Sequence, residues 1–110
     1  MSTKEGKKPA PRVDATLTVV LSIGEAHYVV ETKNVSETGL CLRSKDAFPV
    51  GTEQHLVFGE PPELPRLSAE GIVRWSENGK GVGVEFTSMS PDDRHALLMF
   101  VNSHSRDKQS

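Results

Sequence analysis

Hydrophobic and polar residues alternate along most of the chain with a period of two, which is typical of β-strands that have one buried face. The clearest stretch is 67–76, where Leu67, Ala69 and Val73 alternate with polar residues. The strands predicted from this alternation, and from shorter β-like segments, span residues 15–21, 28–33, 39–43, 55–58, 67–76 and 82–86.

Turn-forming residues separate these segments. Gly24-Glu25 lies between the first two strands, and Asn78-Gly79, a strong hairpin signal, lies between the last two. Short antiparallel strands of this kind most readily close into a barrel, because closure removes the exposed strand edges. We therefore predict an all-β fold, a six-stranded antiparallel β-barrel.

One helix is predicted after the last strand. Ser90 is a suitable N-cap, Pro91 suits the first helical position, and Asp92 and Asp93 place acidic groups in the first turn. Residues 96–101 are all apolar and would cover the whole circumference of the helix. We therefore expect one face to pack on the barrel and the remaining apolar surface to be buried in a homodimer or against a partner protein.

The chain of 110 residues has the length of one domain. Residues 1–12 form a basic segment with two prolines and few apolar side chains, which predicts a flexible N-terminal arm. Residues 13–104 are assigned to the barrel and its C-terminal helix. Residues 105–110 are polar and are predicted to form a frayed tail.

Composition excludes several classes of protein. Thirteen Lys and Arg against fifteen Asp and Glu give a net charge of −2, which does not favour a nucleic-acid-binding or membrane-surface protein. Trp75, the one tryptophan, shares its strand phase with Val73, so we expect it to be buried rather than to stack on bases. No apolar run approaches the length of a membrane span or a signal-peptide core, which predicts a cytoplasmic protein without membrane insertion.

The residues offer no catalytic or metal-binding pattern. The four histidines lack ligand spacing, and no serine stands in a G-x-S-x-G turn. Gly81 and Gly83 lie in a predicted strand, where they favour close packing over a nucleotide loop. Cys41 has no predicted base beside it. We therefore expect a protein that is not an enzyme and needs no metal or cofactor.

Two short segments carry the chemistry. The basic stretch from Lys8 to Arg12 leads into the first strand, and Asn34-Val35-Ser36-Glu37-Thr38-Gly39 connects the second strand to the third. Asn34 and Ser36 can bond a ligand or the backbone, and Gly39 permits a close approach that a side chain would block. Taken alone, the second segment is better explained as an ordinary turn.

Together the two segments resemble those of the PilZ domain family, small six-stranded barrels that bind the bacterial second messenger cyclic di-GMP. The family pattern is Arg-x-x-x-Arg before the first strand and Asp/Asn-x-Ser-x-x-Gly after the second. The resemblance extends to the strand Gly81–Phe86 and to the terminal helix after Ser90. It implies a ligand site formed by Lys8, Arg12, Asn34, Ser36 and Gly39.

Lys8 stands where the family has its first arginine. An ammonium group keeps the charge but lacks the planar fork that grips phosphate and stacks on guanine. Weakening one such contact, worth ~1.5–3 kcal/mol, lowers affinity roughly 10- to 150-fold. Two functions therefore remain open. One is a cyclic di-GMP receptor that signals through contact with another protein, and the other is a PilZ-like interaction module that has lost the ligand.

Overall fold

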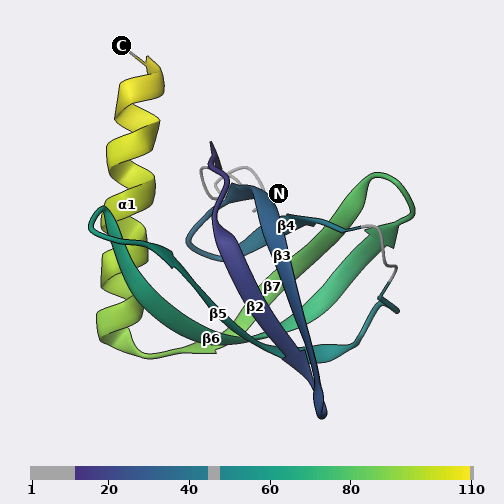
Figure 1. Cartoon of the computed structure of the whole chain (residues 1–110). Helices are drawn as coiled ribbons and strands as arrows, with labels where there is room; N and C mark the ends of the chain where they lie inside the picture. Colours follow the sequence, from purple (N-terminus) through teal and green to yellow (C-terminus); the bar gives the residue numbers. More distant parts are fainter. Residues whose placement is uncertain (1–11, 45–47, 110) are drawn as a thin grey trace, which may run out of the picture.

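The computed structural model describes residues 12–44 and 48–109. Seven strands and one helix follow each other along the chain (Figure 1). They are β1 (Val13–Asp14), β2 (Thr18–Ile23), β3 (Ala26–Val35), β4 (Gly39–Arg43), β5 (Glu53–Glu60), β6 (Leu64–Glu77), β7 (Gly81–Met89) and α1 (Pro91–Gln109).

The strands form one antiparallel sheet in the order β1-β3-β2-β5-β6-β7-β4, and β3 also pairs with β4, which closes the barrel. The six long strands, β2 to β7, confirm the predicted six-stranded antiparallel barrel. The short β1 was not among the predicted strands. It pairs with the end of β3, Val13 opposite Val35 and Asp14 opposite Asn34, and thereby fixes where the N-terminal segment reaches the barrel.

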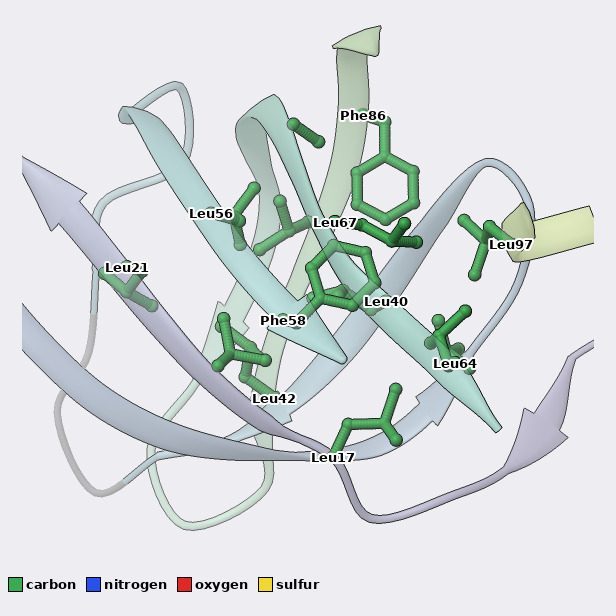
Figure 2. Packing of buried hydrophobic residues seen from close by; sticks show 14 of the residues in the cluster. Leu17, Leu21, Leu40, Leu42, Leu56, Phe58, Leu64, Leu67, Phe86 and Leu97 are labelled. Atoms are coloured by element: carbon green, nitrogen blue, oxygen red, sulfur yellow. The ribbon is translucent and has the colours of Figure 1, made fainter. Parts of the chain in front are cut away.

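The barrel interior is filled by the apolar residues that alternate along the strands. Leu56 and Phe58 of β5 and Leu67 of β6 are fully buried (Figure 2). Val73 of β6 is fully buried as well. The rings of Phe58 and Phe86 stack with their centroids 5.8 Å apart. Removing this apolar surface from water is the main favourable contribution to the stability of the barrel.

Helix α1 begins as predicted. The Ser90 hydroxyl accepts a hydrogen bond of 3.1 Å from the backbone N–H of Asp93, which is the N-cap geometry. Leu97, Phe100 and Val101 are buried, whereas Met99 remains 57% exposed. Part of the apolar surface thus stays uncovered, as expected, and the predicted homodimer remains a prediction.

The C-terminal half of α1 extends beyond the barrel (Figure 1). The helix continues to Gln109 and so includes most of the segment 105–110, for which we predicted a frayed tail. No Gly or Pro follows Pro91, so no residue in this segment is a strong helix breaker.

Candidate functional site

The turn between β3 and β4 is held together by Ser36. Its side chain is fully buried, and its hydroxyl oxygen accepts hydrogen bonds of 3.2 Å from the backbone N–H groups of both Thr38 and Gly39. The backbone N–H of Ser36 also donates to the Gly39 carbonyl at 2.8 Å. The Ser36 hydroxyl therefore stabilises the turn from within.

Gly39 allows β4 to lie close against β7. A Cβ atom at this position would stand only 2.2 Å from the carbonyl oxygen of Val84. The close approach predicted for this glycine is confirmed, and its partner is backbone of the same barrel. Gly39 pairs with Glu85 of β7, so the turn is fixed directly beside that strand.

Arg12 and Asn34 are in direct contact. The Arg12 guanidinium donates a hydrogen bond of 2.8 Å to the Asn34 side-chain oxygen. The pairing of β1 with β3 explains the contact, because it places Asp14 opposite Asn34 and leaves Arg12 just outside the barrel. Lys8, the other predicted binding residue of the N-terminal segment, lies outside the described residues.

Trp75 lies at the surface, so the expectation of a buried tryptophan is wrong. Its side chain is 44% exposed, although Val73, two residues earlier, is fully buried. The pairing of β6 with β7 shifts between Val73 and Trp75, which marks a β-bulge. A bulge adds a residue to one strand and changes the face to which the following side chains point. The period-two alternation fails at this position for that reason.

The indole of Trp75 lies across Gly83, its pairing partner on β7. A Cβ atom on Gly83 would stand 2.0 Å from the indole nitrogen and 2.5 Å from Cδ1. Gly83 therefore leaves the space that the ring occupies, which confirms that this glycine serves close packing. The result is a partly exposed aromatic ring held against the outside of the barrel.

Two surface cavities adjoin this ring and share Arg12, Trp75 and Gly83 as walls. The first, of about 240 Å³, is also lined by Gly39 and Glu85, and the second, of about 180 Å³, by Asn34. The structure thus brings Arg12, Asn34 and Gly39 together at one place. Ser36 holds the adjoining turn and lines neither cavity.

Arg74 and Glu85 form an ion pair in the wall of the larger cavity. The Arg74 Nε group donates to a Glu85 carboxylate oxygen at 2.5 Å, and both side chains are about half exposed. The cavity therefore contains two guanidinium groups, on Arg12 and Arg74, and one carboxylate. Guanidinium groups bind phosphate through paired N–H donors and stack on aromatic rings.

Sequence reasoning missed Arg74, Trp75 and Glu85. The available signal was the hairpin at Asn78-Gly79, which implies that β6 and β7 pair and that residues near position 75 lie opposite residues near position 83. The bulge that turns Trp75 outward leaves no trace in the alternation that precedes it.

The combination of an exposed indole with cationic, planar side chains suits a ligand that has both a flat base and a phosphate. Among residues 12–44 and 48–104, no cluster of three or more His, Cys, Asp or Glu side chains could hold a metal ion. Within the same ranges, α1 is the one helix, and it is too polar to cross a bilayer.

The closed antiparallel barrel with one C-terminal helix is the architecture of a PilZ-type module. The model of the PilZ domain family matches residues 7–103, and the chain belongs to this family. No curated protein sequence matches it.

Several solved structures share the fold. The Bacillus subtilis inhibitor of motility, MotI/DgrA, superimposes with a TM-score of 0.84 at 22% identity over 94% of this chain and 54% of that one. This chain thus spans about half the length of that protein. The PilZ domain of CeSA from a cellulose-synthesizing bacterium gives a TM-score of 0.65 at 14% identity, over 84% of this chain and 95% of that one.

Proposed function

We propose that this protein is a cytoplasmic receptor for cyclic di-GMP and passes the signal on through contact with another protein. The observation that carries the proposal is the position of Arg12 and Trp75, which together border both cavities, the smaller of which is also lined by Asn34. A cyclic dinucleotide offers two phosphates and two flat bases, and these are the groups that guanidinium and indole side chains bind best.

Each side chain has a distinct role in this proposal. Arg12 provides the main phosphate contact, and its guanidinium is already held in place by Asn34 at 2.8 Å. Trp75 supplies a stacking surface for a guanine. Asn34, whose amide both donates and accepts, bonds the edge of a base. Lys8 adds a point charge from the N-terminal segment without the fork of an arginine.

Ser36 acts indirectly in this scheme. Its hydroxyl is engaged by two backbone N–H groups of the turn. We therefore assign it to shaping the turn that carries Gly39 beside the cavity, rather than to a hydrogen bond with the ligand. Gly39 likewise contributes by its closeness to β7.

A second candidate function is a protein-interaction module that no longer binds cyclic di-GMP. Two observations favour it. Lys8 replaces the first arginine of the family pattern, and the buried Ser36 hydroxyl already serves the turn, so Ser36 is needed whether or not a ligand binds. In both candidates the output is a contact with another protein.

Isothermal titration calorimetry with cyclic di-GMP tests the proposal. Wild type is expected to bind, Arg12→Ala to lose binding, and Lys8→Arg to bind at least about tenfold more tightly because the fork is restored. Arg66→Ala is the matched control, because Arg66 is an exposed arginine of β6 that borders neither cavity.

Raising the salt concentration should weaken binding, since exposed cations hold an anionic ligand. If neither wild type nor Lys8→Arg binds at millimolar cyclic di-GMP, the receptor proposal is refuted and the interaction module replaces it. If wild type binds and Lys8→Arg is no tighter, the receptor stands and the role given to Lys8 is wrong.

A further inference from the structure

The two cavities beside Trp75 are lined by different hydrogen-bonding groups. The smaller cavity is bordered by the Asn34 amide, and the larger one by the Glu85 carboxylate. Arg12 and the Trp75–Gly83 pair separate them as common walls. The site therefore consists of two compartments that share a cationic and aromatic centre.

A carboxylate is an unexpected group in a cavity meant for phosphates, because it repels them. Here the Arg74 guanidinium offsets that charge through its contact with Glu85 and at the same time orients the carboxylate. Glu85 lies two residues after Gly83 on the same face of β7, which places it about 7 Å along the strand from the glycine under the indole. It therefore stands beside the stacking surface, where the edge of a stacked base would lie.

We propose, on the basis of the proposed function, that Glu85 is a specificity-determining residue. Its carboxylate hydrogen-bonds the edge of one guanine, while the Asn34 amide hydrogen-bonds the edge of the other. Cyclic di-GMP has two equivalent guanines, which matches two compartments around one centre. The Watson–Crick edge of guanine presents two neighbouring donors, N1–H and N2–H. An ionised carboxylate is an acceptor with two oxygens, so it satisfies both.

Adenine does not fit the same compartment. Its Watson–Crick edge presents an acceptor at N1 beside a donor at N6, so one carboxylate oxygen would face a lone pair. Hydrogen bonds to a charged group are the stronger ones, and an unmatched group in such a site is strongly rejected. Glu85 should therefore exclude adenine from its compartment independently of Asn34.

Three cyclic dinucleotides test the selectivity of the Glu85 compartment: cyclic di-GMP, the mixed 3′,3′-cyclic GMP-AMP, and cyclic di-AMP. Wild type should bind cyclic di-GMP at least about tenfold more tightly than cyclic di-AMP, which has no guanine to place at Glu85. The mixed dinucleotide can place its one guanine at Glu85 and its adenine at Asn34, so it should bind nearly as well as cyclic di-GMP. In Glu85→Ala the ratio of the affinities for cyclic di-GMP and cyclic di-AMP should fall to about two or less, because the Asn34 amide pairs with either purine. Glu53→Ala, which removes an exposed strand glutamate that borders neither cavity, should keep the wild-type ratio.

The ratio is the informative quantity, because removing Glu85 also frees Arg74 and changes the affinity for every phosphate-bearing ligand. If wild type does not discriminate cyclic di-AMP from cyclic di-GMP, or if Glu85→Ala keeps the full ratio, the role of Glu85 is refuted while the receptor proposal stands. If wild type binds none of the three at millimolar concentration, the proposed function itself fails.

Discussion

Replacing Gly83 by alanine should remove the stacking surface of the site without removing any of its side chains. The new Cβ would stand 2.0 Å from the Trp75 indole nitrogen and 2.6 Å from Cε2, which no real contact allows. The obstructing atoms belong to a side chain that is 44% exposed, so the ring can swing away into solvent. The indole would then no longer lie flat between the two cavities.

Gly83→Ala should weaken ligand binding and leave the stability of the barrel nearly unchanged. Stacking of a base on an aromatic ring is worth about 1–3 kcal/mol, so cyclic di-GMP affinity should fall about 5- to 150-fold. An alanine in a strand is favoured over glycine by roughly 0.5–1 kcal/mol, which offsets the displaced packing of the ring. The free energy of unfolding should therefore change by no more than about 1 kcal/mol.

Fluorescence reports on this change directly, because Trp75 is the single tryptophan of the chain. In Gly83→Ala the emission should shift to longer wavelength and acrylamide should quench it more strongly, with or without a ligand. Gly39→Ala provides the contrast. Its Cβ would meet the backbone oxygen of Val84 at 2.2 Å, which cannot swing away, so stability should fall by at least about 2 kcal/mol. A Gly83→Ala variant with unchanged quenching and unchanged affinity would refute the account of Trp75.

Three further results are expected. Ser36→Ala should lower the free energy of unfolding by about 1–3 kcal/mol, measured by urea denaturation, because two buried N–H groups of the turn lose their acceptor; an unchanged midpoint would contradict this role. Gln54→Met should raise the free energy of unfolding by about 1 kcal/mol, seen as a higher urea midpoint, because the buried Gln54 amide has no hydrogen-bond partner in the described structure. A lower midpoint would show that the amide is satisfied. Light scattering should show a dimer that Met99→Lys converts to monomer, since Met99 is the most exposed apolar side chain of α1, and a wild-type monomer without any partner would refute the dimer.

The barrel was predictable because its information is local. Alternation with a period of two is kept wherever a strand has one buried face, and the four residues from Ser90 to Asp93 mark the start of the helix. The short β1 was not predicted, because two residues are too few to show alternation. Strand identity therefore followed from the sequence, apart from an element too short to carry a pattern.

The site was less predictable because it depends on pairing between distant strands. Asn34 and Arg12 were identified from motif spacing, and the structure joins them at 2.8 Å. The exposure of Trp75 depends on a bulge relative to β7, and the direction of the Ser36 hydroxyl depends on how the turn closes. Neither is encoded in the type or spacing of these residues alone.

The turn that carries Ser36 and Gly39 has a consequence for how related sequences should be interpreted. Ser36 closes the turn and Gly39 lets β4 meet β7, so both are required for the barrel to close around its core. A descendant that stops binding a nucleotide would still be selected to keep them. Asn34 and Trp75 are not needed for the barrel to close, so substitutions should accumulate at these two positions first. Residues equivalent to Ser36 and Gly39 in a homologue therefore indicate an intact barrel. Residues equivalent to Asn34, and to Trp75 lying over Gly83, are the better markers of retained ligand binding.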